Sequence, residues 1–365
     1  MKTLLFTLEY PPFYGGVANY YSNLIKYWPK AKLKVGDIFV LNNNDDNLIS
    51  KRLFILKWLP ALLKLWKVIK QEKINNVLVG QILPLGIVTY LISKVIKIKY
   101  TVFLHGMDFT FAIKQPRKRW ITKIILKNSN KIICANSCAA DLAQNFCQEI
   151  KNKINIINPG IEDFTTRLPQ LELQLKIKYS LQSKLILLSV GRLVKRKGFD
   201  KVIECLHEVL KKVPNLIYII IGNGVEVGSL QAKIDDLKLV NKVIIITNAD
   251  DQEKNAWMNL SDIFVMRSIN INGDFEGFGI VYLEANLANK PVIAGQSGGV
   301  GDAVINGLNG LLVDSEKNQQ LIDASIKLAK DPLLRHKLGE QGRQRALKEF
   351  NWQKQIEMVA KLILK

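Results

Sequence analysis

Short apolar runs alternate with longer helical stretches along the whole chain of 365 residues. The runs are rich in Ile, Val and Leu and are bounded by turn or polar residues, as buried strands are. The expected strands are residues 2–8, 35–41, 76–80, 100–104, 131–135 and 153–157, then 184–190, 215–221, 242–247, 262–266, 291–294 and 310–313. This alternation is typical of parallel sheets covered by helices. It predicts an α/β protein.

A polar segment divides the strands into two series. It begins at Asn158-Pro159-Gly160 and continues to about Ser183 with only short apolar runs. The length is sufficient for two domains, each with its own core. We therefore predict two doubly wound, Rossmann-like domains, residues 1–165 and 180–350, that face each other across a cleft. Ligands of such sheets bind at the carboxyl ends of the strands.

The composition excludes several classes of protein. Apolar residues make up 48% of the chain, which excludes disorder. Four cysteines occur without a C-x-x-C spacing and with only three histidines, so reduced, buried thiols are expected and a metal centre is not. No Asp-x-Asp pair follows an expected strand. We predict an activity that needs neither a metal nor a cofactor.

The N-terminal residues do not form a membrane anchor or a signal peptide in this interpretation. Their apolar run is short and leads into Glu9, Pro11 and Pro12 without a cleavage pattern. No apolar stretch approaches the roughly 20 residues that cross a bilayer. A cytoplasmic protein is expected, peripheral at the inner face of the cell membrane.

The positive charge is concentrated in the first half of the chain. Residues 1–153 contain 24 Lys and Arg against 8 Asp and Glu, a balance of +16, whereas the remaining residues carry +4 of the total of +20. Such a surface suits an anionic membrane, and a lysine-rich genome composition is the alternative. No recognition helix or aromatic RNA platform accompanies it, so nucleic acid is not expected as a partner.

One helical stretch concentrates this charge. Residues 53–70 place Lys57, Lys64 and Lys67 on one side of a helix, with two tryptophans among the apolar residues. This pattern fits an interfacial membrane contact and also a core helix with Pro60 in its first turn. Residues 117–120, Arg-Lys-Arg-Trp, form a second candidate membrane patch. The sequence leaves these alternatives open.

The strongest functional pattern is a glycine turn between two carboxylates. Residues 275–284 read Phe-Glu-Gly-Phe-Gly-Ile-Val-Tyr-Leu-Glu, with Glu276 before the turn and Glu284 inside the apolar helix that follows. A helix that starts near Gly279 offers unpaired N–H groups and the positive end of its dipole to a phosphate. Helix capping and a solvated glutamate are the structural alternative.

A cationic loop follows an apolar strand upstream of this turn. Residues 184–190 end in Gly191-Arg192, and Lys197-Gly198 come five residues later. The loop lies at the carboxyl end of a strand, where α/β sheets bind ligands. Arg192 can bind phosphate oxygens bidentately, and Lys197 supplies a point charge. Gly198 allows the chain to turn into the next helix.

These patterns carry a family resemblance that covers nearly the whole chain. Gly191-Arg192, Lys197-Gly198, Gly222-Asn223-Gly224 and the Glu276/Glu284 pair resemble the donor-binding half of retaining GT-B glycosyltransferases of glycosyltransferase family 4. The resemblance continues in three other elements, the loop of residues 10–18, the element His105-Gly106-Met107-Asp108, and Trp352 at the start of the last helix.

The resemblance implies roles for individual residues. His105, Arg192, Lys197 and Glu276 would be catalytic, with Glu276 on the donor sugar and His105 near the reacting carbon. The expected donor-binding residues are Gly15, Gly16, Asp108, Gly222, Gly224, Gly277, Phe278, Gly279, Ile280 and Glu284. Glu284 would bind the ribose, and no residue would bind a metal. Residues 351–365 would form a helix that packs back on the N-terminal, acceptor-side domain.

The resemblance also implies the reaction. A hexose-type sugar would move from a nucleotide-diphosphate sugar, with retention of configuration, to a lipid-linked or cell-envelope glycan acceptor, as in lipopolysaccharide or polysaccharide biosynthesis. The C-terminal domain would bind the donor. Arg267-Ser268 stands where Pro-Ser is usual in the family, which leaves the donor sugar open. A nucleotide-sugar epimerase or a phosphorylase of the same fold is the alternative.

Overall fold

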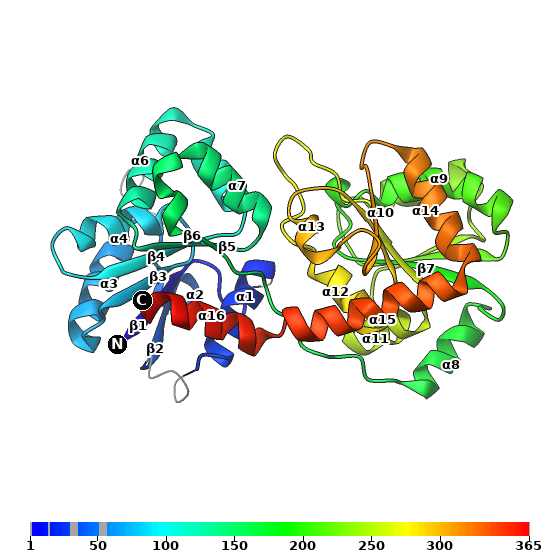
Figure 1. Ribbon diagram of the computed structural model, residues 1–365, viewed down its shortest axis with the longest axis horizontal. Helices are drawn as coiled ribbons and strands as arrows, with labels where there is room; N and C mark the ends of the chain where they lie inside the picture. Colours follow the sequence, from blue (N-terminus) through cyan, green and yellow to red (C-terminus); the bar gives the residue numbers. More distant parts are fainter. Residues whose placement is uncertain (1, 14, 30–35, 51–56, 365) are drawn as a thin grey trace. The chain divides into compact units, whose positions relative to one another are not determined.

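The computed structural model describes residues 2–13, 15–29, 36–50 and 57–364. The chain forms two compact units (Figure 1). Unit 1 contains residues 1–160 and 350–365, and unit 2 contains residues 161–349. Each unit has one six-stranded sheet whose strand pairs are all parallel. The predicted α/β class is therefore confirmed.

The sheet of unit 1 has the strand order β2-β1-β3-β4-β5-β6. Its strands are β1 (Thr3–Thr7), β2 (Ile38–Asn42), β3 (Asn76–Val79), β4 (Lys99–Leu104), β5 (Lys131–Cys134) and β6 (Ile154–Ile156). Each corresponds to an expected strand, although residue 35 of the expected second strand lies outside the described residues. The order reverses beside β1, so the loops after β1 and β3 open at a topological switch point.

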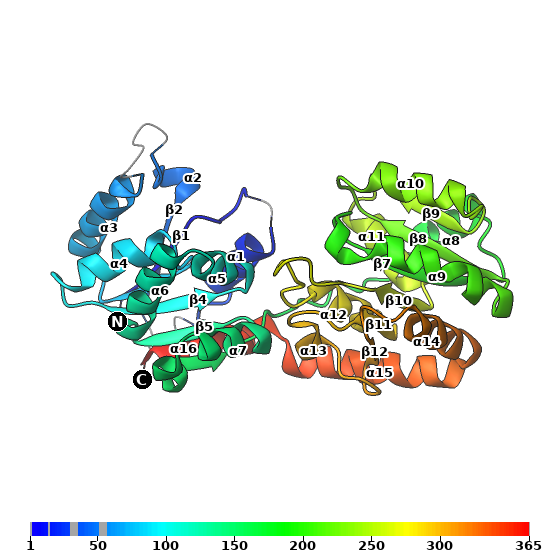
Figure 2. The ribbon, with the colours of Figure 1, turned by 90° about the horizontal axis from the view of Figure 1, so that it is seen from above.

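Helices cover both faces of this sheet (Figure 2). The helices before α16 are α1 (Gly16–Lys26), α2 (Asn43–Asp46), α3 (Leu59–Glu72), α4 (Leu85–Ser93), α5 (Met107–Ile113), α6 (Pro116–Asn128) and α7 (Ser137–Phe146), with the 3-10 helix η1 (Gln148–Lys153). Residues of α3 to α7 share one core with the sheet, and α1 packs on the opposite face.

Helix α3 faces the core of unit 1. Ala61, Leu65 and Ile69 are buried at helical spacing, and Trp58 and Trp66 pack against the same core. The core-helix alternative therefore holds for the apolar side of this stretch. Residues 53–56 of the expected helix lie outside the described residues, and Pro60 stands in the first turn as expected.

The last helix, α16 (Trp352–Leu364), belongs to unit 1 although it ends the chain. Ile356, Val359 and Ala360 are buried in the core that α1 and the sheet form. A side chain at Gly160 would place its Cβ 2.6 Å from the Cα of Trp352, so the end of the first series of strands abuts the start of this helix.

The sheet of unit 2 has the strand order β12-β11-β10-β7-β8-β9. Its strands are β7 (Leu185–Val190), β8 (Leu216–Ile221), β9 (Val243–Ile246), β10 (Ile263–Met266), β11 (Val292–Gly295) and β12 (Gly310–Val313). All six correspond to expected strands. The switch point of this sheet lies between β7 and β10, because the chain moves outward from β7 to one edge and then from β10 to the other.

Two groups of helices cover this sheet (Figure 1). One face carries α9 (Phe199–Lys212), α10 (Val227–Asp236) and α14 (Asn318–Lys330). The other carries α8 (Pro169–Lys178), α11 (Asp251–Leu260), α12 (Ile280–Leu287) and α15 (Pro332–Glu349), and α13 (Val300–Ala303) is a single short turn. In the described part of the chain, no helix is both long and apolar enough to span a bilayer.

Candidate active site

The loop after β7 presents three cations at the switch point of unit 2. Lys195, Arg196 and Lys197 form the one-turn 3-10 helix η2, which ends at Gly198. Gly198 has φ +68°, and a Cβ there would lie 2.0 Å from the carbonyl oxygen of Arg267. A glycine is required for both reasons. It brings the cationic turn directly against the chain that leaves β10.

The carboxylate of Glu276 is the centre of this arrangement. Its side chain is buried, and Oε2 lies 2.5 Å from Nζ of Lys197 and 3.1 Å from Nη1 of Arg196. Ser268 donates a hydrogen bond to the same oxygen at 3.3 Å. Arg196 also pairs with Asp274 at 3.2 Å. Two sequence regions 80 residues apart thus meet in one buried ion cluster.

Glu276 keeps its charge in this environment. Burial raises the pKa of the carboxyl, but the charges of Lys197 and Arg196 and their hydrogen bonds outweigh it and hold the pKa below its ordinary 4.5. A buried carboxylate with two cationic partners remains ionised at neutral pH. Those cations are the groups that a diphosphate would also bind.

Helix α12 begins beside this cluster. Its N-cap, Gly279, has φ +78°, and a Cβ there would lie 2.3 Å from the ring of Tyr282 and 3.5 Å from Cγ of Glu276. The buried Phe278 precedes it, after Gly277, and Ile280 is the first helical residue. The positive end of the helix therefore lies next to Glu276.

Glu284 lies one turn further along α12 and is partly buried. Burial raises the pKa of its carboxyl, while the charges of Lys254 and Lys197 lower it. Lys197 thus acts on both glutamates of the glycine-turn pattern. The structure brings Lys197, Glu276 and Glu284 into one region of unit 2, and their contacts with a donor stay a prediction.

Arg192 differs from the other predicted cations. It follows Gly191 at the carboxyl end of β7, and its side chain is exposed. In the part of the chain that the structure describes, the Arg192 side chain makes no hydrogen bond or ion pair with another residue. Arg196, which the sequence interpretation did not select, is the arginine that binds Glu276. The phosphate contact of Arg192 stays a prediction.

Gly222 and Gly224 support the loop that carries Arg192. A Cβ at Gly222 would lie 1.9 Å from the carbonyl oxygen of Gly191, and one at Gly224 would lie 2.2 Å from that of Leu193. The N–H of Leu193 donates to the carbonyl of Asn223 at 2.9 Å. Close packing of the loops after β7 and β8 therefore explains both glycines, and their contact with a nucleotide stays a prediction.

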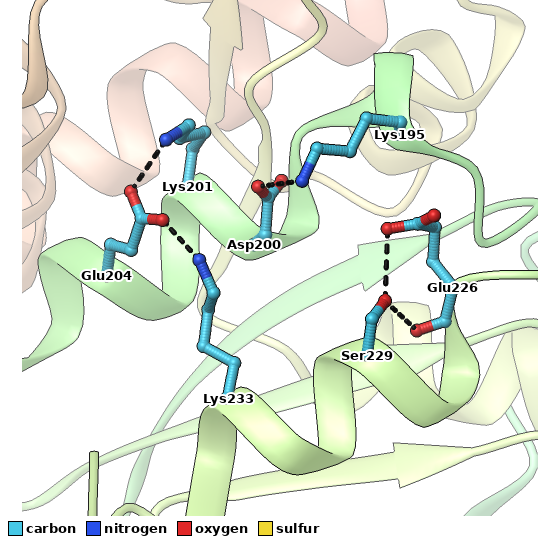
Figure 3. Close-up of polar contacts among 7 residues, drawn as sticks. All are labelled: Lys195, Asp200, Lys201, Glu204, Glu226, Ser229 and Lys233. Atoms are coloured by element: carbon cyan, nitrogen blue, oxygen red, sulfur yellow. Dashed lines mark hydrogen bonds and ion pairs between the residues drawn. The ribbon is translucent and has the colours of Figure 1, made fainter. Parts of the chain in front are cut away.

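Ion pairs hold the start of α9 and its neighbour α10 (Figure 3). Lys195 donates to the buried Asp200 at 2.8 Å. On the same helix, Glu204 pairs with Lys201 at 2.9 Å and with Lys233 of α10. Lys195 is thereby directed to α9, and Arg196 and Lys197 are the residues of η2 that bind Glu276.

Unit 1 has a second group of candidate residues, at the carboxyl end of β4. The hydroxyl of Tyr21 donates to the carbonyl of Gly80 at 2.7 Å and lies 2.8 Å from Nε2 of His105. The single hydrogen of the Tyr21 hydroxyl goes to Gly80, so the hydrogen between Tyr21 and His105 belongs to Nε2 of the imidazole. Nδ1 of His105 is then an acceptor. Burial lowers the pKa of His105 to about 4, so the ring is neutral.

Asp108 holds the His105 loop. Its Oδ1 accepts the backbone N–H of His105 at 3.1 Å, and Oδ2 is buried without a hydrogen-bond partner among the described residues. Burial raises the pKa of this carboxyl to about 6, against hydrogen bonds from Phe109, His105 and Gly106 that lower it. These contacts give Asp108 a positioning role, and its contact with a sugar stays a prediction.

The glycines of the first loop have different surroundings from those of unit 2. Gly15 caps α1 with an extended φ of 169°, which any residue adopts. A Cβ at Gly16 would meet no described atom within 4 Å. Unit 1 itself therefore does not require glycine at Gly16. Close approach of a phosphate remains the predicted reason, and Tyr14 of the same motif lies outside the described residues.

Sequence reasoning missed Arg196, Ser268 and Asp274, which complete the cluster around Glu276. Arg196 lies in the same basic run as Lys197, so the run was a signal for it, but only the helical turn decides which side chain points to Glu276. Within the described residues, no three His, Cys, Asp or Glu side chains group as metal ligands would. The four cysteines are free thiols.

Comparison with known proteins places this geometry in a family. Residues 174–345 match the family described as glycosyl transferases group 1. The crystal structure of Anabaena Alr3699/HepE in complex with UDP superposes with a TM-score of 0.79, at 18% identity and with complete coverage of both chains. At that identity the likeness shows the fold alone. Two such parallel sheets define the GT-B class of glycosyltransferases.

Two relatives share more of the sequence. A GDP-mannose-dependent alpha-(1-6)-phosphatidylinositol monomannoside mannosyltransferase of Mycolicibacterium smegmatis is 32% identical over 208 residues, or 56% of this chain and 54% of the relative. The match spans about half the length of that relative. A GDP-mannose-dependent monoacylated alpha-(1-6)-phosphatidylinositol monomannoside mannosyltransferase of Corynebacterium glutamicum is 24% identical over 370 residues, covering 96% of this chain and 95% of the relative.

Within a chain of GT-B fold, residues 174–345 match glycosyl transferases group 1, and the similarity to a named mannosyltransferase extends over 96% of the chain. The resemblance stated from the sequence is thereby confirmed, and so is the predicted GT-B fold.

Proposed function

We propose that the protein is a metal-independent, retaining hexosyltransferase. It moves a sugar from a nucleotide-diphosphate donor to a lipid-linked or cell-envelope glycan acceptor at the inner face of the cell membrane. The observation that carries this proposal is the cluster of Glu276, Lys197 and Arg196 at the start of α12. It lies after the strands that flank the switch point of unit 2.

The cluster is suited to a diphosphate leaving group. Transfer breaks the bond between the sugar carbon and the phosphate oxygen, so negative charge grows on the diphosphate. Lys197, Arg196 and the first N–H groups of α12 are already oriented and stabilise that charge without a metal. When they bind the diphosphate, Glu276 exchanges its cationic partners for hydroxyls of the donor sugar.

Other residues of the two units take the remaining parts of the donor. Glu284 lies further along α12 and binds the ribose, while the exposed Arg192 adds a bidentate phosphate contact. In unit 1, Nδ1 of the neutral His105 accepts a hydrogen bond from a sugar hydroxyl. Gly15 and Gly16 give a phosphate close access to the chain.

The donor and acceptor classes rest on the relatives and on charge. The two mannosyltransferases use GDP-mannose and phosphatidylinositol mannosides by name. A glycolipid acceptor accords with the +20 net charge of this chain and its basic first half. Retention follows from the resemblance to family 4. Neither the family match nor these relatives favour an epimerase or a phosphorylase.

A donor panel tests this function. The full chain is incubated with GDP-mannose, UDP-glucose and other nucleotide sugars, with and without EDTA, and release of the nucleoside diphosphate is measured. We expect one donor to be hydrolysed or transferred at the same rate in EDTA. Glu276→Gln should lower that rate by a factor of about 10² to 10³, as loss of one preorganised group in a transition-state site does.

Glu204→Gln is the matched control, because Glu204 also pairs with two lysines but on the outer surface of α9. It should act like the wild type. Turnover of no donor, or equal rates for Glu276→Gln, Glu284→Ala and the control, would falsify the proposal. Analysis of the anomeric configuration of the product tests retention separately.

A further inference from the structure

We propose that helices α5 and α6 of unit 1 form the face that docks on an anionic lipid bilayer. This α5–α6 face consists of Met107, Phe111, Lys114, Arg117, Trp120 and Lys123. The proposal rests on the proposed function for the role of this face, since the face would bring the protein to a lipid-linked acceptor. Its physical basis is independent of the donor site, because every residue of the face belongs to unit 1.

Large aromatic side chains are exposed on this face. Phe111 is 56% exposed and Trp120 is 67% exposed, and the two helices that carry them are in contact. Trp120 makes no hydrogen bond or ring contact with any residue that the structure describes. Trp and Phe side chains in such positions enter the boundary between lipid headgroups and acyl chains.

The spacing along α6 places Trp120 away from the core. Ile125 and Leu126 are buried in unit 1. At about 100° per residue, Trp120 lies roughly opposite the direction between them, and Arg117 and Lys123 lie about 60° to either side of it. One outward stripe therefore carries an aromatic ring flanked by two exposed cations.

Charge identifies the partner as an anionic surface. The sequence contains no Asp or Glu between Asp108 and Asp141. Lys114 lies 5.8 Å from the ring of Phe111, so this cation and this ring belong to one patch. Glu149 pairs with Lys127, and this hydrogen bond, together with the charge of Lys123, lowers the pKa of the Glu149 carboxyl. A second copy of the chain would bring two basic faces together and is disfavoured.

The position of the face gives it a function in the reaction. Helix α5 begins two residues after His105, and its seven residues extend roughly 10 Å. A bilayer docked on this face therefore presents its headgroups close to the His105 loop within the same unit. An acceptor sugar attached to a lipid would reach that loop without leaving the membrane.

The structure also distinguishes this face from α3, the other candidate from the sequence. Trp58 and Trp66 of α3 pack against the core of unit 1 and are not available to insert into lipid. Lys67 and Lys70 of α3 are nonetheless exposed. They provide a control with the same change of charge on a different surface.

Vesicle flotation of the full chain tests the proposal. The vesicles contain phosphatidylcholine alone or with about 30 mol per cent phosphatidylglycerol as the anionic lipid. Each kind is used at low and at high salt. We expect flotation only with the anionic vesicles and at low salt. Arg117→Glu with Lys123→Glu should weaken binding about fivefold or more for each residue, whereas Lys67→Glu with Lys70→Glu should have a much smaller effect.

A second measurement follows insertion of the ring. Brominated acyl chains should quench tryptophan fluorescence in the wild type, and Trp120→Phe should remove most of that quenching, whereas Trp58→Phe should not. Equal loss of binding in both double variants, or unchanged quenching in Trp120→Phe, overturns the proposal. Binding to duplex DNA in place of vesicles does so as well. Donor hydrolysis in solution should be normal in Trp120→Phe, so failure here is distinguishable from failure of the transferase proposal.

Discussion

Unit 2 keeps a buried carboxylate charged at the end of its strands, whereas unit 1 holds a buried histidine neutral at the corresponding edge. Glu276 has two cationic partners, and its pKa lies below the ordinary value. His105 has a hydroxyl partner, and burial lowers its pKa to about 4. Both sheets are parallel and doubly wound, so topology does not cause the difference.

The difference in charge comes from the side chains that each sheet brings to its edge. In unit 2, glycines bring a cationic turn against the chain that leaves β10. In unit 1, aromatic rings surround the imidazole, with Tyr20 and Tyr21 in edge contact. Compensated charge suits a diphosphate, and neutral hydrogen-bonding groups suit sugar hydroxyls. The comparison teaches that one topology can give the ends of its strands two different electrostatic environments.

The largest effect is expected when the buried ion cluster of unit 2 loses its carboxylate. Glu276→Ala leaves Lys197 without its carboxylate partner and Arg196 with Asp274 alone, and should lower the free energy of unfolding by about 3–5 kcal/mol. Urea unfolding at pH 7 measures it. Adding Lys197→Met should recover part of the loss. A loss below about 1 kcal/mol would mean that solvent, and not Glu276, compensates these cations.

The same cluster fixes a pH dependence. Because the pKa of Glu276 is lower in the folded state, its contribution to stability is present above the ordinary pKa of 4.5 and is lost as the pH falls through the folded value.

The next effect has the opposite sign and belongs to unit 1. Burial raises the pKa of Asp108 from 3.8 to about 6, so its charge destabilises the fold above pH 6 and the cost is relieved as the pH falls toward 3.8. Asp108→Asn should therefore stabilise unit 1 at pH 7.5 by up to about 3 kcal/mol. The difference from the wild type should disappear near pH 4.

Urea midpoints at pH 7.5 and 4.5 measure this difference. The contribution of the neutral His105 to stability is lost in the same acid range, because the pKa of His105 is about 4 in the folded state and ordinarily 6.5. This loss is the same in the wild type and in Asp108→Asn. A destabilised Asp108→Asn variant at pH 7.5 would show that hydrogen bonds to the charged carboxylate outweigh its burial.

A smaller effect separates the helix starts of the two units. Gly279→Ala forces a side chain into a left-handed conformation with its Cβ 2.3 Å from the Tyr282 ring, and should cost at least about 1–2 kcal/mol. Gly16→Ala meets open space and should change stability by less than about 0.5 kcal/mol. Thermal unfolding of both variants compares them. Similar losses would refute the structural distinction between these glycines.

The smallest effect tests whether burial, and not charge alone, decides the contribution of an ion pair. Lys233→Met removes one of the two lysines from Glu204 on the surface of unit 2 (Figure 3). Because these side chains are partly solvated, the free energy of unfolding should fall by less than about 1 kcal/mol. A loss as large as that of Glu276→Ala would remove the contrast between the two clusters.

The sequence could predict features that depend on local pattern. Strand positions follow from apolar runs of the right length, and each expected strand has a counterpart among the described residues. The glycine turn was predictable because only glycine takes the backbone of Gly279 beside Tyr282. The pairing of that turn with the Lys197 loop followed from the rule that ligands bind at the carboxyl ends of parallel strands.

Other features depended on contacts between distant residues. The basic run from Arg192 to Lys197 offers several equivalent cations, and only the turn η2 decides that Arg196 and Lys197 face Glu276. Asp108 follows His105 in the sequence, yet its buried hydrogen bonds to the backbone give it a different role. Both helices with tryptophan and lysine have a similar composition, but α3 packs its rings in the core and α6 exposes Trp120.

By itself, the amino-acid sequence determined the two doubly wound sheets, the glycines that their loops require and the residue types of the candidate site. Periodicity and backbone restriction act over a few residues, so they can be read along the chain. Only the tertiary structure decided which charges are buried together and which side chains remain exposed. Burial and ion pairing join residues that are far apart in the sequence, such as Lys197 and Glu276, which are separated by 79 positions. A local sequence pattern cannot predict such a contact.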